Sequence, residues 1–212
     1  PSLPCFTEVL PPPPLALRRV LFRGAAPMPQ NFGPTLEGDV ERVLFQPEEL
    51  RQKCEELGAA ISRDYEGKVP LLVGVLSGAA VFMSDLKRCI SIPCEIDFIA
   101  VSSYGKNAVS SELQFKKDVS VDLKDRDVIV IEDIIDTGKT LKAIGEAFSA
   151  RGASSVEYVT LLDKQARRAV DVTAKYVGFE CPDEFVIGYG IDYAERYRNL
   201  PYVAALKRSV YE

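Results

Sequence analysis

The sequence contains no histidine among its 212 residues. This absence excludes histidine as a general base, every Ser/His or Cys/His nucleophile pair, and zinc or iron sites built on histidine ligands. Any proton transfer in this protein must therefore be carried by a carboxylate, a lysine or a tyrosine.

Several other signatures are missing as well. The five cysteines form no CxxC pair and no metal-ligand spacing, so they are interpreted as reduced thiols in a reducing compartment. The longest apolar runs, such as PLLVGVL, are too short to span a bilayer. The net charge of -5 provides no general electrostatic attraction to nucleic acid, although a local basic patch remains an open alternative.

Residues 1–36 differ in composition from the rest of the chain. They contain PPPP at positions 11–14, and their only acid is Glu8 against three arginines, Arg18, Arg19 and Arg23. We expect a proline-rich, disordered extension, or a start site set too early with Met28 beginning a shorter protein. The arginine-bearing, acid-poor bias also fits an organelle presequence, which would replace the expected cytoplasmic location. Residues 37–212 are predicted to form one domain.

From Gly38 onward, short apolar runs alternate with helical patterns. Residues 47–65 place Leu50, Cys54, Leu57 and Ile61 on one helical face. Further helices are predicted at 78–89 and 140–151, and strands at 70–76, 95–104, 128–131, 155–164, 174–179 and 185–191. This alternation predicts an α/β fold with a mainly parallel central sheet flanked by helices. Residues 105–118 have a weak pattern and are predicted to be a polar loop.

Polar groups follow several of these predicted strands. They are Ser77-Gly78, Ser102-Ser103-Tyr104, Glu132-Asp133 and Asp163-Lys164. Ligands of such folds bind in the crevice beyond the carboxyl ends of the strands. The sequence therefore predicts an active site at that edge of the sheet.

The stretch VIVIEDIIDTGKTL at 128–141 ends a buried strand with three acids and a turn rich in backbone donors and hydroxyls. A glycine-bearing turn that enters a helix can hold a phosphate, because the first helical N–H groups lack partners. An ordinary helix cap with a strand-to-helix turn is the alternative interpretation. A Walker A loop is excluded, because Asp133 stands where that motif needs glycine. Paired acids beside a phosphate fit a sugar diol or a divalent cation.

The whole stretch resembles the phosphoribosyl-pyrophosphate motif of the type I phosphoribosyltransferases. VLSGAAVF (75–82) resembles their pyrophosphate loop, DFIAVSSYG (97–105) the start of their lid, and LLDK (161–164) their base-contacting strand end. PDEFVIGYGIDYAERYRNLPYVAAL (182–206) is similar to the closing segment of hypoxanthine-guanine phosphoribosyltransferases. The likeness runs from about residue 38 to the C-terminus and favours the bacterial-like form.

The resemblance implies the type I phosphoribosyltransferase fold, with a small hood segment and a mobile lid loop. It also implies a role in purine salvage, in which the 5-phosphoribosyl group passes from phosphoribosyl pyrophosphate to hypoxanthine or guanine. The products would be IMP or GMP plus pyrophosphate. Mg²⁺ is the implied cofactor, and a homo-oligomer, dimer or tetramer, is the implied assembly, with neither nucleic acid nor membrane as a partner.

Site roles follow from the same resemblance. Glu132 and Asp133 would hold the ribose hydroxyls and associated magnesium, and Asp136 would be the general acid/base that handles the proton of the purine imidazole ring. The 5′-phosphate loop would consist of Thr137, Gly138, Lys139 and Thr140.

The purine and pyrophosphate sites are implied in the same way. Lys164 would donate to the 6-oxo group, Phe185 would stack on the base, Val186 would offer backbone groups, and Asp192 would be a second magnesium ligand beside the base. The pyrophosphate contacts would be Ser77, Gly78 and Arg198, with Ser77 standing where the family can carry Lys. Ser103 and Tyr104 would open a lid over 105–118, for which a plain hairpin loop is the alternative.

Two competing functions remain open from the sequence alone. A sibling enzyme that prefers xanthine would differ through small contacts near Val186 and Asp192. A regulator with the same fold that binds RNA would need a basic face. The acidic balance and the set Asp136, Lys164, Phe185 and Asp192 favour the enzyme.

Overall fold

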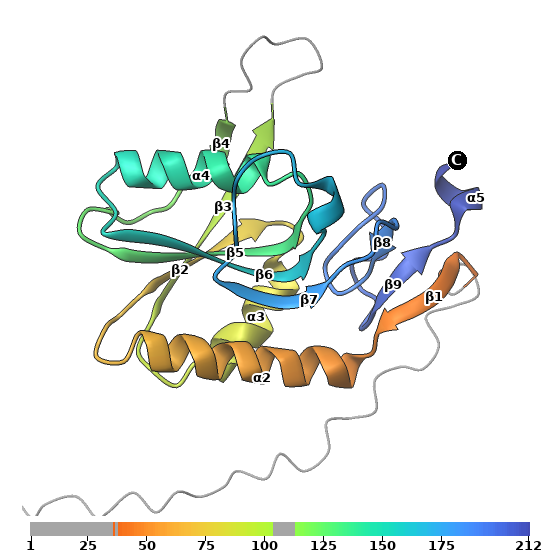
Figure 1. The fold of residues 1–212 in the computed structure, drawn as a ribbon, viewed down its shortest axis with the longest axis horizontal. Helices are drawn as coiled ribbons and strands as arrows, with labels where there is room; N and C mark the ends of the chain where they lie inside the picture. Colours follow the sequence, from red (N-terminus) through yellow and green to blue (C-terminus); the bar gives the residue numbers. More distant parts are fainter. Residues whose placement is uncertain (1–35, 37, 104–112) are drawn as a thin grey trace, which may run out of the picture. The chain divides into compact units, whose positions relative to one another are not determined.

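The computed structural model describes residues 36, 38–103 and 113–212 (Figure 1). The predicted extension at 1–36 lies outside the described residues except for Leu36, and so does the predicted lid residue Tyr104. In the described part of the chain, no helix has the length and apolar character needed to cross a membrane.

A six-stranded sheet forms the centre of the domain, in the order β4-β3-β2-β5-β6-β7. Every neighbouring pair is parallel except β3 and β4. This arrangement confirms the predicted α/β fold with a mainly parallel sheet. The strands are β2 (Leu71–Leu76), β3 (Glu95–Ser103), β4 (Leu113–Lys117), β5 (Asp127–Ile135), β6 (Ser155–Asp163) and β7 (Tyr176–Glu180).

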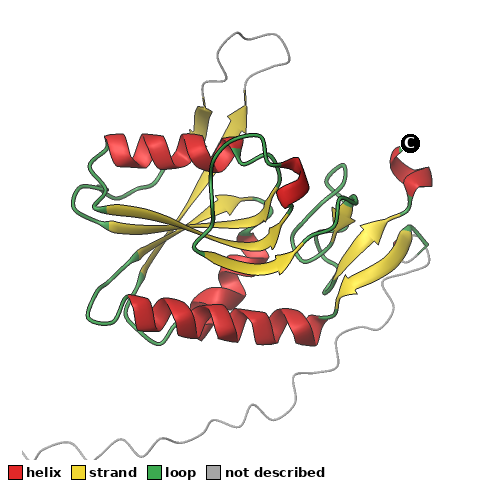
Figure 2. Ribbon diagram, in the orientation of Figure 1, coloured by secondary structure: helices red, strands yellow, loops and turns green. Residues whose placement is uncertain are grey.

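Helices cover both faces of this sheet. α2 (Pro47–Asp64) and α3 (Ala80–Cys89) lie on one face, and α4 (Lys139–Ala150) lies on the other (Figures 1 and 2). Strand β5 contributes side chains to the hydrophobic cores on both faces of the sheet, because successive side chains of a strand point in opposite directions. Its residues Ile129 and Ile131 join the core under α2 and α3, while Val128 and Val130 join the core under α4.

The predicted helices are confirmed to within two residues at each end. In α2, the predicted apolar positions Leu50, Cys54, Leu57 and Ile61 are all buried. Pro47 occupies the first turn, where its missing N–H costs nothing, and the Gln46 amide donates to Glu49 Oε2 over 2.8 Å.

A second, three-stranded antiparallel sheet has the order β1-β9-β8. It consists of β1 (Val40–Phe45), β8 (Val186–Ile187) and β9 (Val203–Leu206), and we call it the hood sheet. In Figure 1 it lies beyond the carboxyl ends of β6 and β7. The predicted strand at 185–191 is wrong beyond Ile187, because Gly188 and Gly190 take positive φ and turn the chain.

The loop prediction for residues 105–118 is wrong in part. Residues 113–117 form β4, which pairs with β3 through Val101 and Phe115. Residues 104–112 lie outside the described part of the chain. The alternating pattern of LQFKK is too short and too polar to predict a strand from the sequence. Edge strands such as β4 often carry charged residues, which weakens the apolar pattern.

Asp97 on β3 links this strand to β4 and to the segment that follows β4. Its carboxylate pairs with Lys117 Nζ over 2.8 Å and accepts hydrogen bonds from the Ser120 amide and hydroxyl over 2.6 and 2.8 Å. Partial burial opposes the ionisation of this carboxyl, but these donors and the Phe98 amide outweigh it and hold its pKa below the usual range.

We expect Asp97→Asn to lower the free energy of unfolding by about 1.5–3 kcal/mol at pH 7, because hydrogen bonds to a charged group are lost. A depressed carboxyl pKa stabilises the fold fully above the unfolded value of about 3.9, and the stabilisation is lost progressively as the pH falls from there through the lower folded pKa. Urea unfolding from neutral to strongly acidic pH should therefore show a constant difference between the two proteins above the unfolded value and a shrinking difference below it. The exposed Asp122, changed to Asn, is the control and should alter stability by less than about 0.5 kcal/mol. A loss that stays constant with pH would contradict this account.

Candidate active site

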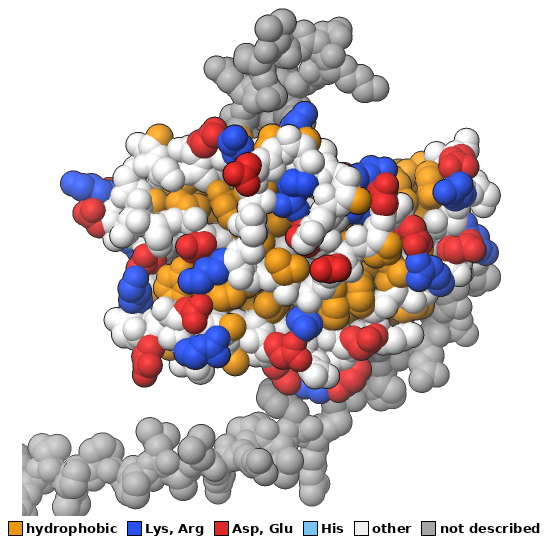
Figure 3. Space-filling view, in the orientation of Figure 1, with side chains coloured by type: hydrophobic (Ala, Val, Ile, Leu, Met, Phe, Trp, Pro, Cys, Tyr) orange, Lys and Arg blue, Asp and Glu red, His pale blue; other side chains and the backbone are white. Residues whose placement is uncertain are grey.

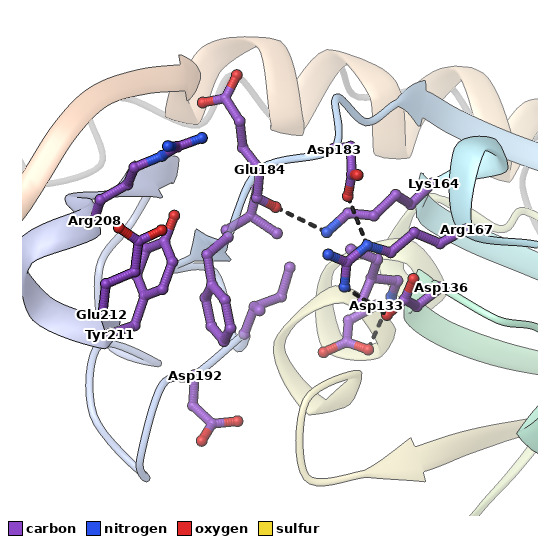
Figure 4. A pocket seen from close by; sticks show the side chains of 14 residues that line it. Asp133, Asp136, Lys164, Arg167, Asp183, Glu184, Asp192, Arg208, Tyr211 and Glu212 are labelled. Atoms are coloured by element: carbon purple, nitrogen blue, oxygen red, sulfur yellow. Dashed lines mark hydrogen bonds and ion pairs between the residues drawn. The ribbon is translucent and has the colours of Figure 1, made fainter.

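A cavity of about 520 Å³ lies between the main sheet and the hood sheet (Figure 4). It is where the carboxyl ends of β5 and β6 face the segment that contains β8. Six residues singled out in the sequence line it together, although they come from distant parts of the chain. They are Asp133, Asp136, Lys164, Phe185, Val186 and Asp192.

A smaller pocket of about 100 Å³ adjoins the start of α4. Among the residues that line it are Glu132, Asp136, Thr137, Gly138 and Thr140. Gly138 has a φ of +79° and precedes α4, and the first turn of a helix can bind an anion through its backbone amides. The first of these amides, that of Lys139, donates to Thr137 Oγ1 over 3.5 Å. Lys139 begins the helix with an exposed side chain and is not among the lining residues.

The adjacent acids Glu132 and Asp133 face different spaces, as the pleat of a strand requires. Glu132 lines the small pocket, whereas Asp133 lines the large cavity. Burial, together with the neighbouring Asp133, raises the pKa of Glu132 well above its ordinary value, and burial also raises the pKa of Asp133. Glu132 Oε2 has no hydrogen-bond partner in the described part of the chain. This pair is suited to a cation or to hydroxyl donors.

The loop between β2 and α3 approaches Asp133 closely. A Cβ added at Gly78 would lie 1.9 Å from Asp133 Oδ2, and one added at Gly190 would lie 2.2 Å from the Gly78 carbonyl oxygen. Arg198 donates to the Gly190 carbonyl over 2.9 Å and pairs with Asp192 Oδ1 over 2.9 Å. The structure therefore brings Gly78, Asp133, Asp192 and Arg198 together, with Ser77 exposed at the edge.

Lys164 follows β6 and is buried, with 6% of its surface exposed. Its Nζ donates to the Glu184 carbonyl oxygen over 2.8 Å, and its amide donates to the Ile135 carbonyl oxygen over 2.9 Å. An ammonium carries three donors, so others remain for a ligand in the cavity. Phe185 is 40% exposed, which is unusual for a residue of its size and leaves ring surface for a ligand.

Asp136 lies where the two pockets meet, because it lines both of them. Its Oδ1 atom is buried without a hydrogen-bond partner among the described residues. Its Oδ2 atom lies 3.9 Å from Arg167 Nη1, and Arg167 Nε pairs with Asp183 Oδ1 over 2.6 Å (Figure 4). A carboxylate oxygen with no donor is a ready acceptor for a proton of a bound molecule.

The sequence patterns did not reveal several residues that support the site. Arg168 pairs with the buried Asp163 and donates to the Asp136 carbonyl oxygen over 3.3 Å, so it holds the turn before the small pocket. The signal was the pair Arg167-Arg168, which follows LLDK after two residues and so lies close to a strand end already marked as polar. Tyr211, which lines the large cavity, has no comparable signal in its sequence surroundings.

Comparison with known proteins identifies the family. Residues 43–194 match the phosphoribosyl transferase domain. The chain belongs to this family. The hypoxanthine-guanine phosphoribosyltransferase of Bacillus subtilis (strain 168) is 51% identical over 178 residues, which cover 84% of this chain and 99% of the relative. The enzyme of the same name from Streptococcus mutans is 51% identical over 177 residues, which cover 83% of this chain and 98% of the relative.

Solved structures of this phosphoribosyltransferase family agree with the fold. The crystal structure of a hypoxanthine phosphoribosyltransferase from Staphylococcus aureus superimposes with a TM-score of 0.82 at 47% sequence identity. The match covers 86% of this chain and all of that chain, 100%. The mainly parallel sheet with flanking helices is therefore the type I phosphoribosyltransferase fold that the sequence resemblance implied.

We expect Gly138→Ala to destabilise the protein by about 1–3 kcal/mol through its positive φ, and by more through contact. The added Cβ would lie 2.5 Å from Val172 Cγ1 and 2.9 Å from Arg168 Cδ. Gly67→Ala is a matched control, because Gly67 has a φ of +77° and a Cβ added there would meet no atom within 4 Å. Urea unfolding of both variants separates the two costs. Equal losses would show that the turn of the small pocket is not packed as described.

Proposed function

We propose that the protein is a purine-salvage enzyme that transfers the 5-phosphoribosyl group from phosphoribosyl pyrophosphate to hypoxanthine or guanine. The products are IMP or GMP and pyrophosphate. One observation carries the proposal: buried Lys164, unpartnered Asp136 Oδ1 and half-exposed Phe185 share a cavity next to a small pocket at the start of α4 in the described part of the chain. The names of the relatives from Bacillus and Streptococcus support the same activity.

The small pocket and the large cavity bind different parts of the substrates. The 5′-phosphate occupies the small pocket, where Thr137 and Thr140 add hydroxyls to the first amides of α4. The base occupies the large cavity against Phe185, with its 6-oxo group facing Lys164. An ammonium donates only, so it accepts a 6-oxo purine and disfavours the 6-amino group of adenine. The backbone of Val186 faces the edge of the base, and Asp192 lies beside it.

In the reaction, a ring nitrogen of the purine forms a bond to the anomeric carbon of the ribose. The bond from that carbon to pyrophosphate breaks, and pyrophosphate leaves with the electron pair. Asp136 Oδ1 takes the proton that the imidazole ring gives up, since no histidine is present to do so. Arg198 and the backbone at Ser77 and Gly78 stabilise the charge that grows on the leaving group.

Magnesium fits this donor set. Asp133 is buried at the large cavity, and Glu132 is partly buried at the small pocket, where its Oε2 atom is buried without a partner in the described part of the chain. Among the described residues, no three acidic, cysteine or histidine side chains are close enough to hold a metal alone. Mg²⁺ is commonly held by one or two carboxylates together with substrate oxygens. We assign Glu132, Asp133 and Asp192 to such ions, which would neutralise the leaving pyrophosphate.

The remaining parts of the proposal concern the surroundings of the enzyme. The resemblance implies a cytoplasmic homo-oligomer, and light scattering after size-exclusion chromatography measures the subunit number. On the face drawn in Figure 3, acidic and basic side chains of the described residues are interspersed. This face has no continuous basic stripe of the kind that RNA binding would favour, and the net charge of -5 also favours the enzyme over an RNA-binding regulator.

A spectrophotometric assay with phosphoribosyl pyrophosphate and magnesium tests the activity with four bases. We expect turnover of hypoxanthine and guanine, and none of adenine, because Lys164 offers donors only. Xanthine in the same panel measures the selectivity that contacts near Val186 and Asp192 set. Asp136→Asn should lower kcat by about 10²–10⁴-fold, the usual contribution of a general base. No turnover by folded protein with any base would refute the proposed function.

Lys164→Met removes the ammonium and keeps an unbranched side chain. We expect kcat/KM for hypoxanthine to fall by about 10²-fold or more, because the 6-oxo group loses its donor in a buried site. The exposed Lys142, changed to Met, is the control and should leave kcat/KM unchanged. An equally active Lys164→Met variant would place the base elsewhere in the cavity.

A further inference from the structure

After the hood sheet, the chain returns to the large cavity, which is proposed to bind the purine base and is called the base cavity from here on. Helix α5 (Arg208–Tyr211) follows β9, and Arg208 and Tyr211 line the cavity. Figure 4 shows them on the side opposite Lys164 and Asp136. The last motif quoted for the family resemblance ends at residue 206, so no site role was assigned to a residue of α5 from the sequence.

Tyr211 touches the ring that is proposed to carry the base. Its ring centroid lies 5.1 Å from that of Phe185, with 31° between the planes. Tyr193 also contacts Phe185, edge-on at 5.2 Å, but it does not line the cavity. The two tyrosine rings also contact each other, with centroids 6.5 Å apart, so the three rings form one aromatic cluster in which Tyr211, and not Tyr193, lines the cavity.

The position of Tyr211 is set by the start of the domain. The Lys207 amide donates to the Asp39 carbonyl oxygen over 2.9 Å, and Lys207 Nζ donates to the Gly38 carbonyl oxygen over 2.6 Å. The turn is closed by the Val210 amide, which donates to the Lys207 carbonyl oxygen over 3.0 Å. These hydrogen bonds hold the start of α5 next to the residues that precede β1, and this fixes the position from which Tyr211 contacts Phe185.

Tyr211 also separates two spaces. A neighbouring cavity of about 420 Å³ is lined by Glu41, Asp183, Glu184, Leu206, Arg208 and Tyr211. Because Arg208 and Tyr211 line both this cavity and the base cavity, they form part of the wall between them. Without the Tyr211 ring, the base cavity would open toward its neighbour and Phe185 would lose one of its two aromatic contacts.

We propose that Tyr211 is a positioning residue of the base site, which orients the Phe185 ring and bounds the cavity opposite Lys164. This inference rests on the proposed function. An aromatic pair of this kind contributes enough to change affinity by about three- to tenfold. Loss of Tyr211 should weaken the binding of the purine base and not that of phosphoribosyl pyrophosphate, because Tyr211 lines the base cavity and not the small pocket.

Steady-state kinetics of four variants test the inference. Tyr211→Ala should raise KM for hypoxanthine by about three- to tenfold, with kcat and KM for phosphoribosyl pyrophosphate unchanged. Tyr211→Phe keeps the ring and should restore the wild-type KM. Tyr211→Leu keeps apolar bulk without a ring, remains informative if the alanine variant fails to fold, and should still raise KM for hypoxanthine. Ser209→Ala, exposed on the same turn and lining neither cavity, is the control.

An unchanged KM for hypoxanthine in both the alanine and leucine variants would overturn the inference. A parallel loss in kcat and in both KM values would also overturn it, because that pattern indicates general loosening of the hood sheet. Either result requires an active wild-type enzyme. A wild-type protein that turns over no purine would instead refute the proposed function, so the two failures are distinguishable.

Discussion

The site depends on the burial of β5 on both faces between β2 and β6. Residues Val128, Ile129, Val130 and Ile131 are fully buried, and they supply both cores of the domain. The strand is also paired on both sides, with β2 from Val128 to Ile131 and with β6 from Asp127 to Ile135. Its carboxyl end therefore delivers Glu132 and Asp133 to fixed places. The turn that follows leads into α4, and its residues Asp136, Thr137 and Gly138 line the small pocket.

The charged side chains at the ends of β5 and β6 determine which ligands the site can bind. Burial raises the pKa of Glu132 and Asp133, which makes their site unfavourable for two anions and favourable for a cation or for hydroxyl donors. On the opposite side, Lys164 is nearly buried against a backbone carbonyl. The base cavity thus has a cation at one edge and acids at another. A molecule that carries a 6-oxo purine, a ribose diol and phosphates satisfies both.

The parts of this arrangement that lie close together in the sequence were predictable. The strand, the acids and the glycine-bearing turn before α4 occupy one run of residues, 128–141, so their chemistry is visible in the local sequence. Long-range pairings were not predictable, because a single sequence carries no record of them. Val40 pairs with Leu206 across almost the whole domain to build the hood sheet, and neither strand has a strong pattern of its own. The contact of Tyr211 with Phe185 depends on that pairing.

A crystal structure with bound GMP tests the central claim most directly, because it places every part of one molecule at once. The account predicts the phosphate at the first amides of α4 beside Thr137 and Thr140. It also predicts the 6-oxo group within hydrogen-bonding distance of Lys164 Nζ and the guanine ring against Phe185. A nucleotide whose phosphate lies away from α4, or whose base lies outside the cavity between Lys164 and Phe185, would contradict it.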